Sequence, residues 1–109
     1  MTSDDERRLR RVAAEAVRNA DPAATEAWAS LEALSSATRV DSLEVFEEEI
    51  LLGGQGFRGS VLWHVTLVYN DPDGPITLTN SFPGHFEGEF LGQDAEVRRV
   101  TADTSSFYQ

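Results

Sequence analysis

Residues 57–82 read FRGSVLWHVTLVYNDPDGPITLTNSF, and this stretch decides the fold. Two runs rich in β-branched and aromatic residues flank the turn sequence DPDG at residues 71–74, which is the pattern of a β-hairpin. Proline presets φ early in such a turn, and glycine tolerates a positive φ later in it. If this tetrapeptide is the loop, Trp63 faces Phe82 across the hairpin and every other pair in the two strands is fixed.

This register predicts one strongly apolar face and one mixed face, because side chains point alternately to opposite sides of a strand. The apolar face is formed by Val61, Trp63, Val65, Leu67, Tyr69, Ile76, Leu78 and Phe82. The mixed face carries His64, Thr66, Val68, Thr77, Thr79 and Ser81. Helices can cover only one face of a single sheet, so we expect them on the apolar face and solvent on the mixed face.

The chain before the hairpin supplies two helices and a strand. Apolar residues at helical spacing predict a first helix over residues 3–20, with Ser3 and Glu6 as a capping box. A second helix begins at Asp21-Pro22, since aspartate caps and proline suits the first helical position. A strand is predicted over residues 38–52. We expect Trp28 and Trp63 to be buried where the helices meet the sheet.

The chain after the hairpin supplies two more strands, over residues 85–91 and 95–102. Pro83-Gly84 is expected to turn the chain before the first of them. The sequence therefore predicts a single α+β domain, with two N-terminal helices packed on one face of a five-stranded antiparallel meander sheet. Within it, the helical part spans residues 1–38, the antiparallel sheet residues 39–103, and a polar tail residues 104–109.

The chain is strongly acidic and contains no lysine. Its 109 residues include 19 Asp and Glu against nine Arg, for a formal net charge of −10. Residues 22–56 hold seven of the acids and one Arg, which gives this stretch a charge of −6. Two explanations stay open: a surface adapted to high salt, or a surface that docks a basic partner.

Glu47-Glu48-Glu49 interrupts the strand predicted over residues 38–52. Strand alternation would point at least one of these glutamates toward the helices, unless a bulge intervenes. Charge on a strand can guard an exposed sheet edge against pairing with another chain. It can also raise the rate of encounter with a basic protein. On the second interpretation the candidate partner-binding residues are Glu44, Glu47, Glu48 and Glu49.

Several classes of function are disfavoured by composition. The chain has no Cys for thiol chemistry, and its acidity argues against direct contact with nucleic-acid phosphates. The charged N-terminus has no apolar signal core, and no apolar run approaches the length of a membrane span, so we expect a cytoplasmic protein without membrane contact.

No catalytic residue, cofactor or metal is predicted. His85, Glu87 and Glu89 share one face of a strand, but ligands at that spacing rarely converge on one ion. His64 lies mid-strand, and nothing in the sequence places a nucleophile beside it.

The first functional hypothesis is a small, non-enzymatic interaction protein of the inhibitor, antitoxin or immunity type. Its acidic surface would bind a basic protein, such as one that itself binds nucleic acid. The alternative is a small-ligand-binding or accessory domain that uses the open sheet face, in the manner of cystatin-like or NTF2-like cones. Its candidate ligand face is His64, Thr66, Thr77 and Thr79. An enzyme with His64 as base ranks last, and an open face or edge strand also makes a homodimer an expectation.

Overall fold

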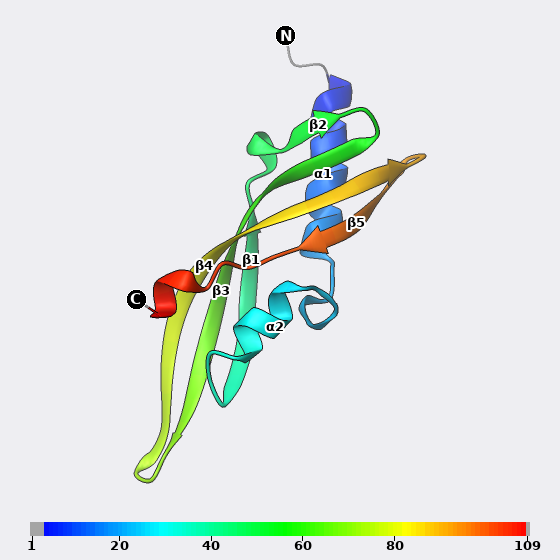
Figure 1. Ribbon diagram of the computed structural model, residues 1–109. Helices are drawn as coiled ribbons and strands as arrows, with labels where there is room; N and C mark the ends of the chain where they lie inside the picture. Colours follow the sequence, from blue (N-terminus) through cyan, green and yellow to red (C-terminus); the bar gives the residue numbers. More distant parts are fainter. Residues whose placement is uncertain (1–3, 109) are drawn as a thin grey trace.

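The computed structural model describes residues 4–108 and arranges them as two helices followed by a twisted antiparallel sheet (Figure 1). The helices are α1 (Asp4–Arg18) and α2 (Ala27–Glu32), and the 3-10 turns are η1 (Pro22–Ala24), η2 (Glu47–Glu49) and η3 (Ser105–Tyr108). The strands are β1 (Ala37–Val45), β2 (Leu51–Gly53), β3 (Gly56–Asp71), β4 (Gly74–Leu91) and β5 (Asp94–Val100). The capping box predicted at Ser3 lies outside the described residues.

The predicted α+β class, with N-terminal helices and a five-stranded antiparallel sheet, is confirmed. The strands run in the order β1-β3-β4-β5, and β2 pairs with β3 beyond the end of β1. The sheet is therefore built around the β3–β4 hairpin, as the sequence predicts. The strand boundaries, however, differ from the prediction in two places: the first predicted strand is split into β1 and β2, and the third and fourth predicted strands form the single strand β4.

The strand predicted over residues 38–52 is interrupted. β1 ends at Val45, the three glutamates form the turn η2, and β2 begins at Leu51. Adjacent carboxylates repel one another, and a continuous strand would have turned at least one of them toward the apolar face. The 3-10 turn removes this conflict, and Ile50 directly after it is 1% exposed.

The β3–β4 hairpin has the predicted register and is longer than predicted. The Cα partners include Asn70 with Pro75, Tyr69 with Ile76, Leu67 with Leu78 and Trp63 with Phe82. Pairing runs without a shift from Gly56 to Asp71 on β3. At the turn, the Asp73 N–H donates to the Asp71 carboxylate at 2.9 Å. Gly74 takes a φ of 125°, a conformation that L side chains rarely adopt.

The turn predicted at Pro83-Gly84 is wrong, because the chain passes through both residues as part of β4. The Pro83 carbonyl accepts a hydrogen bond from the Asp103 N–H, so the polar groups of Pro83 point away from β3 and its missing N–H breaks no bond of the hairpin. Gly84 leaves room for Thr101, whose carbonyl lies against the strand and accepts a bond from the Trp63 indole at 3.0 Å.

The core lies on the predicted apolar face of the sheet. Its largest fully buried side chains are Trp63, Phe82, Leu31, Ile50, Leu67, Val17, Val61, Val65 and Val100. Nearer the β2 end, two aromatic rings cover glycines on the neighbouring strand: Phe57 lies opposite Gly88, and Phe86 opposite Gly59. A Cβ at either glycine would overlap with the ring, so the glycines let the aromatic side chains lie flat against the sheet.

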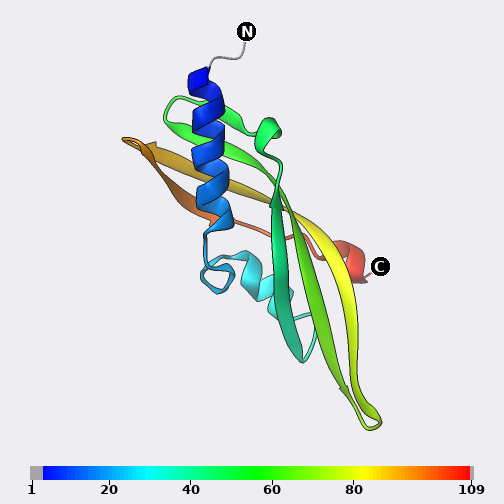
Figure 2. The same ribbon diagram turned by 180° about the vertical axis from the view of Figure 1, so that it is seen from behind.

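The two helices cover different parts of this face. Figure 2 shows α1 over the end of the sheet that contains β2 and β5, while α2 lies nearer the middle. Ala13, Ala14 and Val17 bring α1 close, since small side chains permit a short approach. Trp28 is only partly buried, which corrects the expectation that both tryptophans are buried at the interface.

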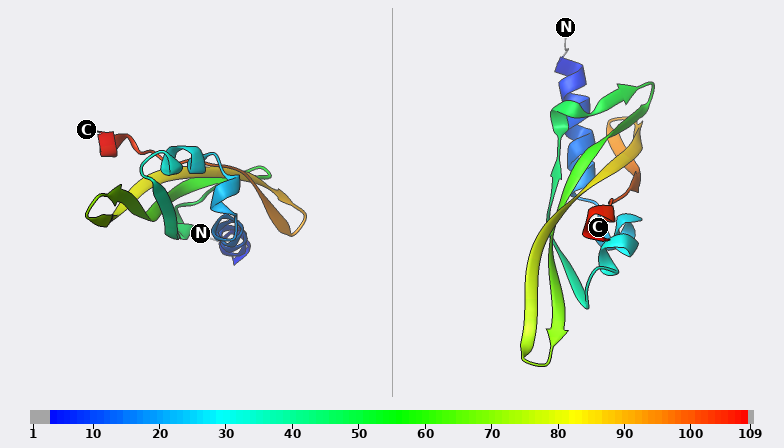
Figure 3. Two further views of the ribbon diagram at one scale, coloured as in Figure 1. Left: turned by 90° about the horizontal axis from the view of Figure 1, so that it is seen from below. Right: turned by 60° about the vertical axis from the view of Figure 1, so that its left-hand side comes forward.

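The far end of the hairpin projects as an arm (Figure 3). Its β4 side runs from Gly74 to Ser81, and β1 flanks its β3 side as far as Val68, so only residues 69–76 are two-stranded. The molecule is accordingly elongated, with extents of 57 × 24 × 19 Å. Ile76 and Leu78 belong to the apolar face, as the register predicts, but they are 47% and 50% exposed and lie outside the core. Register predicts the face on which a side chain lies, whereas burial also requires a helix that reaches it.

The C-terminal segment packs back onto the sheet. Phe107 in η3 meets Phe82 edge to face, with ring centroids 6.3 Å apart. The Asp103 carboxylate accepts the Ser105 N–H at 2.9 Å, and hydrogen bonds from Ser105 lower the pKa of Asp103. The tail predicted over residues 104–109 thus docks through an aromatic residue as far as it is described.

Candidate functional site

The mixed face of the hairpin is open to solvent and brings polar side chains from β1, β3 and β4 together. His64, Thr79 and Ser81 border a shallow hollow of about 490 Å³, along with Asp41 and Asn80. Of the candidate ligand residues, His64 and Thr79 therefore share a site. Thr66 is only 7% exposed and is engaged with Asp41, and Thr77 lies farther out on the arm.

His64 stands between a hydroxyl and a carboxylate. Its Nδ1 lies 2.8 Å from Ser81 Oγ, and its Nε2 lies 3.2 Å from Glu44 Oε1. Ser81 is the direct partner of His64 across the hairpin. The predicted register already contained that pair, but the role of Ser81 was missed. Glu44, which the sequence analysis proposed as a partner-binding residue, contacts His64.

Glu44 reaches His64 because β1 carries a bulge at Asp41. The β1–β3 register shifts between Val40, which faces Val65, and Ser42, which faces His64. One extra residue on one strand twists the pair and displaces the side chains that follow. The extra residue is Asp41, whose position no sequence pattern indicated.

The carboxylate of Asp41 accepts two hydrogen bonds, one from a residue of β3 and one from a residue of β1. Thr66 Oγ1 donates to Oδ2 at 2.5 Å, and Arg39 Nε donates to Oδ1 at 3.0 Å. The hydrogen bond from Thr66 is the larger cause, and that from Arg39 the smaller, of a lowered pKa at Asp41. Both favour the ionised carboxylate.

Replacing Thr66 with valine is expected to raise the pKa of Asp41 toward its ordinary value of 3.8. Because the folded pKa is depressed, this carboxylate stabilises the fold above the unfolded pKa, and the contribution is lost as pH falls through the folded pKa. An NMR titration of the Asp41 carboxyl carbon measures the shift. Arg39→Gln is the comparison, which removes the arginine hydrogen bond and its positive charge and should also raise the pKa of Asp41. An unchanged pKa in Thr66→Val would show that the hydroxyl does not hold the carboxylate.

Ser81, His64 and Glu44 form a hydrogen-bonded series like that of a catalytic triad. Acyl transfer, however, requires more than these three groups. It also needs N–H donors aimed at the developing oxyanion. The Ser81 N–H is already bound to Asn80 Oδ1 at 2.8 Å, so it is not free for that role. Ser81 and His64 also lie on an exposed strand face, where water competes for each interaction. The arrangement fits a cross-strand polar ladder.

The four glutamates predicted to bind a partner are distributed over two sites. Glu44 contacts His64, and Glu47 pairs with Arg18 of α1 at 3.7 Å. Glu48 and Glu49 are exposed on η2 and make no ion pair within 4.0 Å in the described part of the chain. Glu48 borders a hollow with the arginines of α1, whereas Glu49 borders another on the open face.

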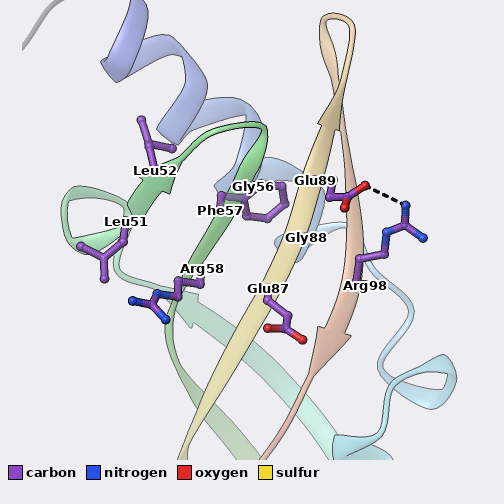
Figure 4. Close-up of a pocket in the computed structure, with 10 residues that line it drawn as sticks. Leu51, Leu52, Gly56, Phe57, Arg58, Glu87, Gly88, Glu89 and Arg98 are labelled. Atoms are coloured by element: carbon purple, nitrogen blue, oxygen red, sulfur yellow. Dashed lines mark hydrogen bonds and ion pairs between the residues drawn. The ribbon is translucent and has the colours of Figure 1, made fainter.

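A row of side chains crosses the open face near the β2 end of the sheet. The row runs Leu51, Arg58, Glu87 and Arg99, each opposite the next on the adjoining strand. Figure 4 shows Arg58 and Glu87 at a hollow of about 490 Å³, with Glu89 joined to Arg98 at 3.0 Å. A second hollow of about 550 Å³ continues past the same row to His85. Leu51 is 58% exposed at the border of both hollows.

The three polar residues that the sequence predicted to share one face of a strand lie together on the open face of β4. His85, Glu87 and Glu89 are all exposed. Within residues 4–108, no three His, Cys, Asp or Glu side chains gather closely enough to hold a metal ion.

Comparisons with models of protein families, with curated proteins and with solved structures found no match to this chain. Among the described residues, neither helix has the length and apolar character that crossing a bilayer requires.

Proposed function

We propose that this chain is a small, non-enzymatic interaction protein that binds a basic protein through its acidic surface. The observation that carries the proposal is the balance of ion pairs. Most of the arginines are engaged, including Arg8, Arg10, Arg18, Arg39, Arg98 and Arg99. Within the described chain, acids that form no such pair include Glu15, Glu32, Glu48, Glu49, Asp73, Glu87 and Asp94.

The turn η2 is the part of this surface best shaped for docking. It leaves the sheet between β1 and β2, so Glu48 and Glu49 extend from an edge and are not held within a ladder. Backbone hydrogen bonds, from the Glu49 N–H to the Phe46 carbonyl and from the Ile50 N–H to the Glu47 carbonyl, hold the turn. Only the glutamate side chains would therefore lose conformational entropy when a partner binds. Glu47 is already used by Arg18 and positions the turn against α1.

Neutralising Glu48 and Glu49 together tests the proposal. We expect Glu48→Gln with Glu49→Gln to slow association with an immobilised arginine-rich peptide several-fold and to flatten its dependence on salt. Surface plasmon resonance at two salt concentrations measures both effects. The fold should be unaffected, because both side chains are exposed.

A second double variant, Glu32→Gln with Asp94→Asn, removes the same charge at exposed positions away from η2. It should leave the association rate near that of the unmodified chain. An equal decrease of the association rate in both variants would mean that only net charge matters and that η2 is not a docking site. If Glu48→Gln with Glu49→Gln formed new oligomers and kept an unchanged association rate, the result would instead support the alternative that these glutamates guard a sheet edge against pairing.

The other expectations from the sequence remain proposals of lower rank. A small-ligand-binding or accessory role would use the hollows of the open face, beside His64 or beside Arg58. A cytoplasmic location agrees with the acidic, cysteine-free composition.

A further inference from the structure

We infer that two copies of this chain pair through the outer edge of β4, from Gly74 to Phe82, in a two-fold antiparallel arrangement. This inference is independent of the proposed basic partner. It rests on the free edge of the arm, on its lack of charge and on its exposed apolar side chains.

The outer edge of β4 is covered at one end of the strand and free at the other. β5 pairs only with residues 86–91 of β4. The N–H groups of Thr101 and Asp103 then bond to the carbonyls of His85 and Pro83. In the described part of the chain, no strand pairs with this side of β4 between Gly74 and Phe82.

The polar groups that this edge presents can be assigned from the same bonds. Backbone groups alternate in direction along an antiparallel strand, so the outward carbonyls of His85 and Pro83 imply that Ser81, Thr79 and Thr77 also face outward. The Ser81 N–H is bonded to Asn80 Oδ1. The outward N–H groups of Thr77 and Thr79 remain as donors, and their carbonyls as acceptors.

The lack of charge on this edge makes it suitable for a second copy of the same acidic chain. Two molecules of net charge −10 repel one another, and the outer edge of β1 carries charged residues and a bulge. By contrast, residues 74–84 contain no charged residue at all. The β4 edge is therefore where self-association meets the least repulsion. Antiparallel pairing also sends the two acidic bodies in opposite directions.

The limits of the free edge set the register. Gly74 ends it at the hairpin turn and Phe82 ends it before the Asp103 bond, so its midpoint is Leu78. A two-fold axis there places Thr77 opposite the partner's Thr79, with two N–H···O bonds at each of the two pairs. Leu78 then meets the partner's Leu78, and Ile76 lies diagonally beside it. These are the two side chains that the arm leaves about half exposed.

Sedimentation of four chains tests this arrangement. The mass of the unmodified chain should rise from 12.0 kDa toward twice that value between micromolar and millimolar concentration. Thr79→Pro removes one outward N–H without breaking the hairpin, as Pro75 and Pro83 show, and should stay monomeric. Leu78→Glu should also stay monomeric through charge repulsion, while the control Thr79→Val should dimerise normally. Circular dichroism confirms that each variant is folded.

Cross-linking tests the register. The chain has no cysteine, so Leu78→Cys introduces a single thiol that should form a disulfide-linked dimer under mild oxidation. Thr38→Cys, on β1, is the comparison and should cross-link far less. A chain that is monomeric at every concentration overturns the inference. A dimer that persists in both Thr79→Pro and Leu78→Glu also overturns it, because it must use another surface.

Discussion

Replacing Trp63 with alanine is expected to lower the free energy of unfolding by about 3–5 kcal/mol. Trp63 is 1% exposed at the centre of β3, opposite Phe82, which is fully buried. Removing the indole loses its transfer free energy and leaves a cavity that the surrounding strands cannot close. It also leaves the Thr101 carbonyl without the indole N–H that donates to it at 3.0 Å.

Urea unfolding monitored by circular dichroism measures this loss. Trp28→Ala is the matched comparison, because it removes the same side chain from a partly buried position in α2 and should cost clearly less. A loss below about 1 kcal/mol for Trp63→Ala would contradict the burial of this residue.

Replacing Gly84 with alanine is expected to cost about 3 kcal/mol, the upper end of the usual range for overpacking. A Cβ at Gly84 would overlap with the Thr101 carbonyl oxygen and come within 3.0 Å of the Trp63 Nε1. The first obstacle is backbone, so relief requires residues after β5 to move away from β4. That movement would break the Trp63–Thr101 bond as well.

Gly53→Ala gives the control for this substitution. A Cβ at Gly53 meets no atom within 4 Å, and its φ is not positive, so stability should change by less than about 0.5 kcal/mol. Thermal unfolding of the two variants side by side measures the difference. Equal stability of Gly84→Ala and Gly53→Ala would show that Thr101 does not lie against β4.

The hairpin could be predicted because its information is local. The turn at residues 71–74 fixes the pairing of neighbouring residues, and strict alternation then assigns each side chain to a face. The same reasoning failed at Pro83-Gly84, since a Pro-Gly pair that usually marks a turn is here shaped by a distant residue, Thr101. No pattern near residue 83 contains that contact.

The candidate site shows the same limit. The pair of His64 with Ser81 follows from the predicted register, whereas Glu44 joins them only through the bulge at Asp41. A bulge adds one residue without a distinct signature in a strand of mixed polarity. Likewise, Ile76 and Leu78 are on the face that alternation predicts, but they stay exposed because the arm extends past the helices.

The long β3–β4 hairpin has a consequence for how the chain folds. If pairing starts at its two-residue turn, each new pair lengthens the closed loop by only two residues. The entropy of loop closure is thus overcome once, at the turn, and the strands can zip from the arm toward the body. The contact between Trp63 and Thr101 spans 38 residues, so its loop-closure entropy is larger and we expect it to form later. The region that projects farthest from the core is therefore the one best placed to form first.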